Sequence, residues 1–143
     1  MKFIIHGGTL SRSLQSISSV VPSGRTMPIL LNFLMEVENE ELKITASDLE
    51  TTITVKLNPS MLEQDQVNKI AIPAKMFLEV VNSLSSQQIT VEVKENYSIE
   101  ITAGTGSYKL VGEDPASYPT AIELSDPALT TISSSVLVKA IGK

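Results

Sequence analysis

The chain has 143 residues, of which 42% are hydrophobic, and its formal net charge at pH 7 is −5. This length suits one ordinary domain with its own core, and the acidic balance argues against a protein that holds nucleic acid by bulk electrostatic attraction. The absence of cysteine and the single histidine exclude disulfides and thiolate metal sites and argue against a histidine-based zinc site. We therefore expect no metal and no cofactor.

No stretch of the sequence approaches the roughly 20 apolar residues that a membrane span requires. The N-terminal residues 1–5 run into His6, Gly7 and Gly8 before the apolar core of a signal peptide could form. We therefore expect a cytoplasmic protein with no membrane partner.

The first predicted elements are a strand over residues 2–5 and a helix over residues 9–20. Apolar residues recur in the helix at helical spacing, at Leu10, Leu14 and Ile17. The rest of its surface is rich in serine, which has weak helix propensity, so packing on the remainder of the protein must stabilise it.

Strands are predicted for most of the next 30 residues. The run 29–37 has apolar residues at both parities for most of its length, which is typical of a strand covered on both faces. Residues 42–46 and 53–57 alternate between apolar and polar, as in antiparallel strands with one face in water. Residues 58–68 form a polar connection.

A second strand and helix follow this connection. The strand covers residues 69–72 and leads into a helix at Pro73. Proline is tolerated in the first turn of a helix, because the backbone amide that it lacks would have no hydrogen-bond partner there. Three more alternating strands are predicted, over residues 89–93, 99–103 and 108–110.

The C-terminal part of the chain has a different composition. Residues 112–127 are rich in proline, glycine and acidic residues without a clear period, which indicates a linker. Residues 128–143 hold one predicted strand and an incomplete helix, too little to bury a core.

A repeated unit of one strand, one helix and three strands is the main architectural signal. Residues 5–10 match residues 72–77, and residues 132–137 begin the pattern a third time. Repeats that cannot bury their apolar faces alone pack on one another. The sequence thus predicts a duplicated α+β fold in which two helices pack on antiparallel sheets.

Catalytic chemistry has weak candidates in this sequence. Asp48 and Glu50 are close carboxylates at a predicted hairpin, and such pairs serve acid–base catalysis. No histidine, cysteine or lysine lies nearby in sequence, and aspartate at a tight turn commonly bonds to the backbone, so the structural interpretation is favoured. For His6 a lone surface histidine is the favoured interpretation. Gly7-Gly8 lacks the lysine of a phosphate-binding loop, so capping and helix entry explain it better. We assign no catalytic residue and no metal ligand.

Arg25 is a stronger candidate for binding. It lies in a loop after the first predicted helix and is followed by Pro28 and the apolar run. A cation mounted in this way is well placed to contact phosphate, although a solvent-facing loop arginine is the simpler alternative.

Several motifs in order resemble the first domain of the bacterial β sliding clamp, the processivity subunit of DNA polymerase III. They are the opening Met1-Lys2-Phe3, residues 25–32, 42–50 and 72–75, and Tyr118-Pro119. The resemblance covers residues 1–125, with a linker from about residue 112. Residues 126–143 resemble the truncated start of the second clamp domain.

The resemblance implies a non-catalytic function in DNA replication. In this family two subunits of three domains each close head to tail into a ring around duplex DNA, and the ring tethers the replicative polymerase. Helices face the DNA, so sequence-independent contacts permit sliding. Polymerase and clamp loader bind through the later domains, which are absent from this sequence. A protein-interaction module that reuses the same fold is the alternative, and an enzyme built around Asp48 and Glu50 is a distant third.

The resemblance also assigns roles to individual residues. Arg25 matches a DNA-contacting loop arginine, and Arg12 lies on the first helix that faces the DNA. The predicted subunit interface comprises residues of the second helix and the last strand: Lys75, Met76, Val80, Tyr108 and Leu110. The family often places more basic residues on these helices and on the last hairpin, whereas this chain has Asn82 and residues 105–107 there.

Overall fold

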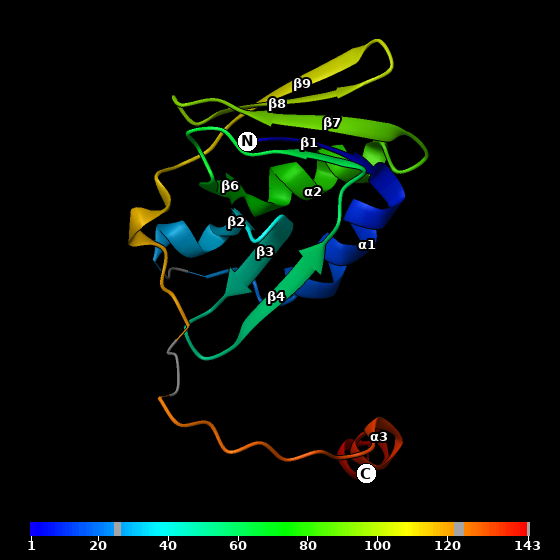
Figure 1. The fold of residues 1–143 in the computed structure, drawn as a ribbon, viewed down its shortest axis with the longest axis vertical. Helices are drawn as coiled ribbons and strands as arrows, with labels where there is room; N and C mark the ends of the chain where they lie inside the picture. Colours follow the sequence, from blue (N-terminus) through cyan, green and yellow to red (C-terminus); the bar gives the residue numbers. More distant parts are fainter. Residues whose placement is uncertain (25–26, 122–124, 143) are drawn as a thin grey trace.

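A computed structural model describes residues 1–24, 27–121 and 125–142 (Figure 1). The first repeat unit contains β1 (Lys2–His6), α1 (Gly7–Ser18), a 3-10 turn η1 (Pro28–Leu31), β2 (Asn32–Glu38), β3 (Glu41–Ser47) and β4 (Thr52–Leu57). A short strand β5 (Met61–Glu63) connects it to the second unit. That unit contains β6 (Lys69–Pro73), α2 (Ala74–Ser83), β7 (Gln88–Val93), β8 (Ser98–Ala103) and β9 (Gly106–Val111). A second 3-10 turn, η2 (Pro115–Ser117), and the helix α3 (Ser134–Ile141) follow.

The two units exchange their first strands. The five-stranded sheet has the order β5-β1-β7-β8-β9, and the four-stranded sheet has the order β4-β3-β2-β6, with all pairs antiparallel. The exchanged pairs have matching registers, since Ile5 lies opposite Ile89 in one sheet and Ile72 opposite Phe33 in the other. Each sheet therefore depends on both units, and the duplicated α+β fold predicted from the sequence is confirmed.

One core joins the sheets to both helices. It contains the fully buried rings of Phe3, Phe33 and Phe77, and the predicted apolar stripe of α1 is buried in it. A smaller cluster surrounds η1 and comprises Ile29, Leu30, Leu34, Ala71 and Tyr118. α1 and α2 lie side by side, and each packs against strands of both sheets (Figure 1).

Several elements differ from the sequence-based prediction. The strand predicted from residue 29 begins only at Asn32, because Pro28 starts a 3-10 turn and the Asn32 side chain donates a hydrogen bond to the Ile29 carbonyl oxygen (3.1 Å). The connection 58–68 contains β5, which pairs with β1 at the sheet edge. α1 begins at Gly7 rather than at residue 9, because the His6 side chain accepts a hydrogen bond from the Gly8 amide.

The segment expected to be a linker is anchored through Tyr118. Ala71 and Glu113 exchange two backbone hydrogen bonds (3.2 and 2.8 Å), so the chain after β9 pairs with β6. The Tyr118 ring is buried, and its hydroxyl donates a 3.4 Å hydrogen bond to the Thr45 carbonyl oxygen. This contact holds the segment against the four-stranded sheet.

The described residues after this anchor make no buried contacts. Residues 125–142 are exposed, and the strand predicted before α3 is not formed, because a single strand needs a pairing partner. α3 itself agrees with the predicted helix. Within the described ranges, no helix is both long and apolar enough to cross a membrane.

Candidate nucleic-acid interface

Glycine allows the two helices to approach closely at one end. A Cβ atom on Gly7 would lie 2.2 Å from the Leu84 carbonyl oxygen, and one on Gly8 would lie 2.9 Å from the Ser85 carbonyl oxygen. Neither distance is compatible with a side chain, so the first turn of α1 packs directly on the backbone that follows α2. The His6 side chain caps this turn through a 3.2 Å hydrogen bond from the Gly8 amide. Gly7-Gly8 thus has the role in helix entry that the sequence favoured, whereas the exposed His6, expected to be a lone surface histidine, also caps the helix.

A polar junction joins the middle of α1 to the C-terminal end of α2. The Ser11 hydroxyl donates a 2.5 Å hydrogen bond to Asn82 Oδ1. Gln15 Nε2 donates to Ser11 Oγ and to Asn82 Oδ1, both at 3.2 Å. Ser11 is only 7% exposed, although its polarity had placed it on the solvent side of the predicted helix. A polar residue on a buried helix face has no periodicity signal, and its partner lies 71 residues away.

The exposed face of α1 and α2 is polar and only slightly positive. Its charged residues are Arg12 on α1 and Lys75 and Glu79 on α2, which gives a formal charge of +1 from two cations and one carboxylate. The remaining exposed side chains are mainly hydroxyls and amides. Such a face can contact the DNA backbone through hydrogen bonds but attracts it weakly through charge.

Of the two predicted DNA-binding arginines, the structure describes one. Arg12 is exposed on α1, next to the polar junction in sequence. Arg25 lies outside the described residues. Lys75, a predicted interface residue, is exposed on α2 and is a second cation on the helix face.

β9 forms an unpaired edge of the five-stranded sheet and also contacts α2. Met76 and Tyr108 are 54% and 39% exposed, and Val80 is partly buried, so these predicted interface residues are accessible. Leu110, the remaining predicted interface residue, is 5% exposed and belongs to the core, opposite Ile99, so little of its side chain is accessible to a second subunit. Tyr108 and Leu110 lie on the same face of β9, opposite Ile101 and Ile99, and of the two it is Leu110 that the core covers. Val111 is 74% exposed at the end of β9, and sequence reasoning missed it.

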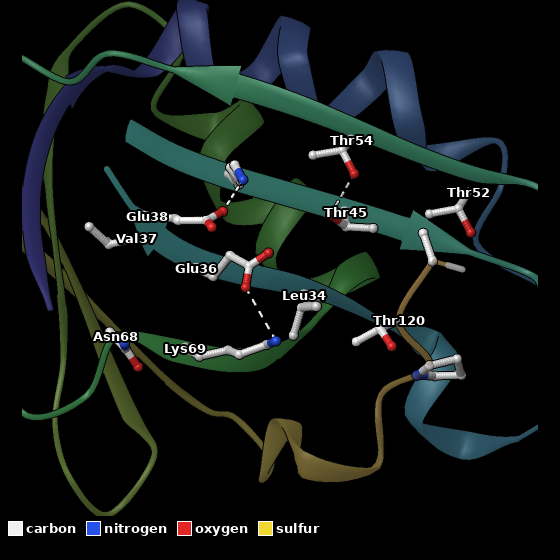
Figure 2. Close-up of a pocket in the computed structure, with 13 residues that line it drawn as sticks. Leu34, Glu36, Val37, Glu38, Thr45, Thr52, Thr54, Asn68, Lys69 and Thr120 are labelled. Carbon is white, nitrogen blue, oxygen red and sulfur yellow. Dashed lines mark hydrogen bonds and ion pairs between the residues drawn. The ribbon is translucent and has the colours of Figure 1, made fainter. Parts of the chain in front are cut away.

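The outer face of the four-stranded sheet is hollowed into a groove of about 580 Å³ (Figure 2). Its charged side chains pair with one another, Lys69 with Glu36 at 3.2 Å and Lys43 with Glu38. The hydrogen bond from Lys43 and its charge lower the pKa of the Glu38 carboxyl, and the same contact raises the pKa of Lys43. The groove therefore presents neutralised ion pairs rather than a free charge.

The hairpin that holds Asp48 and Glu50 has a structural explanation. Asp48 Oδ1 accepts hydrogen bonds from the amides of Glu50 (3.0 Å) and Thr51 (2.6 Å), and Ser47 Oγ accepts one from the Leu49 amide (3.2 Å). These bonds hold Leu49 at a positive φ of 77°. The Asp48 carboxylate is thus occupied by the turn, as the structural interpretation of the sequence predicted.

Comparison with known proteins assigns the family. The family model described as DNA polymerase III beta subunit, N-terminal domain, matches residues 1–123. The chain belongs to this family. A beta sliding clamp of Vibrio harveyi is 31% identical over 120 residues, which cover 83% of this chain and 81% of that sequence. A beta sliding clamp of Chlamydia pneumoniae is 28% identical over 119 residues, which cover 83% of this chain but only 32% of the relative.

Solved structures of sliding clamps have the same fold as this family member. The DNA polymerase III subunit beta of Pseudomonas aeruginosa superposes with a TM-score of 0.87 at 27% identity, covering 99% of this chain and 38% of that one. The DNA polymerase sliding clamp of Bacillus subtilis superposes with a TM-score of 0.86 at 25% identity and the same coverage. This chain thus spans little more than a third of these clamps.

Proposed function

We propose that this chain is the N-terminal domain of a DNA sliding clamp, with residues 1–125 forming that domain and residues 126–143 starting a second. Its main support is the pair of adjacent helices, whose exposed face is polar and slightly positive, in a chain of the clamp family. In a closed ring these helices would face duplex DNA of any sequence. The exposed apolar side chains of α3, such as Val136 and Ile141, are consistent with further chain that covers them.

The clamp tethers the replicative polymerase by encircling DNA in the cytoplasm and performs no catalysis. Polymerase and clamp loader bind through domains other than this one. Encirclement explains how an acidic protein can stay on DNA, because a topological link does not require strong electrostatic binding to the phosphate backbone. The alternative of a protein-interaction module has no specific observation in its favour.

Loading onto DNA tests the helix face. In a full-length clamp carrying this domain, replacing Arg12 and Arg25 together with alanine should lower the yield of clamp loaded onto nicked circular DNA several-fold, since about two phosphate contacts are lost. Lys56→Ala and Lys69→Ala on the four-stranded sheet, away from the helices, provide the matched loss of two charges. Equal loading of all three proteins would reject the assignment of this face.

Subunit mass tests the β9 edge. We propose that Lys75, Met76, Val80 and Tyr108 lie in a head-to-tail interface with a second clamp subunit. Replacing Met76 and Tyr108 with aspartate in the full-length clamp should yield monomers, because unpaired charges would be buried between subunits. Light scattering measures the mass, and Gln64→Asp is an exposed control outside the edge. Leu110 is unsuitable for this test because a charge there would disrupt the domain's own core. A dimer of unchanged mass would place the interface elsewhere.

A further inference from the structure

The polar junction between α1 and α2 fixes the orientation of an exposed amide. Two donors, the Ser11 hydroxyl and Gln15 Nε2, converge on Asn82 Oδ1 at 2.5 and 3.2 Å. The same Gln15 nitrogen also donates to Ser11 Oγ, so the three side chains form a closed network from two helices. The oxygen of the amide is thereby held toward α1.

This orientation leaves the nitrogen of the amide available to a ligand. Asn82 is exposed, and no acceptor among the described residues receives a hydrogen bond from its Nδ2. Nδ2 carries two N–H donors. Phosphodiester oxygens only accept hydrogen bonds, so they are complementary to this group. We propose that Asn82 donates to the phosphate backbone of DNA as a neutral contact between the two helices; this inference rests on the proposed clamp function.

The neighbouring hydroxyls cannot replace this donor without breaking an existing bond. Ser13, Ser16 and Ser83 each donate to a carbonyl oxygen of their own helix, at 3.1, 2.6 and 2.7 Å. Their oxygens therefore present lone pairs to the solvent, and these can reach a phosphate only through a bridging water. Asn82 differs because its donors are already free and its acceptor is already occupied.

Charge on the same stripe of α2 limits how tightly the backbone is held. Lys75 and Asn82 are seven residues apart, about 10.5 Å along one side of the helix, with Glu79 between them. The carboxylate offsets the lysine, so the neutral amide contributes contact without counterion release. Each phosphate neutralised by a cation steepens the salt dependence of log K by about 0.9, whereas a neutral hydrogen bond does not. The face thus favours loose, weakly salt-dependent contact.

The ¹⁵N-labelled 143-residue chain and a 12-base-pair duplex of mixed sequence provide the test. Titration at 50 mM salt should shift backbone amides of α1 and α2 and the Asn82 side-chain amide. Asn82→Asp should weaken binding about fivefold, as for a lost hydrogen bond, and leave the unfolding midpoint unchanged, because aspartate still accepts from Ser11 and Gln15. Asn82→Lys should strengthen binding and steepen the salt slope by about 0.9.

A matched control separates this contact from net charge. Asn96 lies in the β7–β8 turn, and its Oδ1 accepts a 3.1 Å hydrogen bond from the Ser98 amide, which Asn96→Asp preserves. Equal weakening by the two aspartates would overturn the inference. A lower unfolding midpoint for Asn82→Asp would also overturn it, because the amide would then be turned the other way.

The remaining outcomes distinguish this contact from the clamp function itself. Shifts on α1 and α2 that weaken with Arg12→Ala but not with Asn82→Asp would reject the Asn82 contact alone. Absence of helix shifts, for both the unchanged chain and Asn82→Lys, would reject the DNA-facing role of this surface together with the contact.

Discussion

At the scale of single residues, Gly7 determines how closely the two helices pack. It is buried at the point where the first turn of α1 meets the Leu84 carbonyl, and the sequence offered only its position before a helix. The repeat has Ala74 at the equivalent position of α2, so the glycine is a feature of one unit only. Its role arises from the packing of the two units.

Gly7→Ala should therefore destabilise the domain by about 2 kcal/mol, because the added methyl group forces the helices apart. Gly24→Ala is the matched control, since a Cβ there meets no atom of the described residues within 4 Å, and its effect should stay within about 0.5 kcal/mol. Urea unfolding followed by circular dichroism measures both free energies. Equal stabilities would show that the helices adjust without cost.

The ion pair of Glu38 and Lys43 makes a small, pH-dependent contribution. Lys43 lowers the pKa of Glu38 in the folded protein, so the contribution is present above the unfolded value of about 4.3 and is lost as the pH falls through the folded pKa. Lys43→Met should thus destabilise the domain at pH 7 and have a smaller effect at pH 2.5. Lys75→Met, which removes a lysine without an ion pair to a described residue, should show no such difference. Thermal unfolding of both variants and of the unchanged chain at pH 7 and pH 2.5 measures these differences.

At the scale of elements, hydrophobic periodicity predicted both core helices and eight of the nine strands that the structure describes, together with a strand before α3 that does not form. The sequence did not predict β5, because three residues are too few to show an alternation of apolar and polar side chains, and its pairing with β1 depends on the tertiary fold. The 3-10 turn at Pro28 was not predicted, because a short apolar run is compatible with both a strand and a 3-10 turn. At the candidate site, the exposure of Arg12 was predictable from helical spacing. The exposure of Met76, which the spacing placed on the apolar side of its helix, and the junction of Ser11 with Asn82 required the folded structure, as did the inward position of Leu110.

The anchor at Tyr118 predicts where the folded unit ends. A chain ending at Ala121 should keep the stability of the 143-residue chain, because the described residues beyond it are exposed. A chain ending at Val111 should lose about 3 kcal/mol or more, since the buried Tyr118 ring and the Ala71–Glu113 bridge are removed. Tyr118→Phe is the control, because it keeps the ring and removes only a long hydrogen bond. Chemical denaturation of the four chains compares them, and equal stability of the two truncations would refute the anchor.

At the scale of the whole molecule, the exchange of first strands makes the two repeat units mutually dependent. β1 pairs with β7 of the second unit, and β6 pairs with β2 of the first. If the two units were separated, each sheet would lose the strand that the other unit supplies, and the apolar side of each helix would be uncovered. The duplication visible in the sequence therefore describes one folding unit rather than two small domains.

Chains of residues 1–66 and 67–121 test this dependence. Each alone should lack cooperative unfolding, because neither can form a covered sheet of its own. An equimolar mixture should regain the circular dichroism spectrum of the intact chain, and its unfolding midpoint should rise with concentration because association is now bimolecular. A mixture with Gly7→Ala in the first piece should reassemble less tightly, since Gly7 contacts the carbonyl of Leu84 in the other piece. Cooperative folding of either piece alone would show instead that strand exchange follows the folding of independent units.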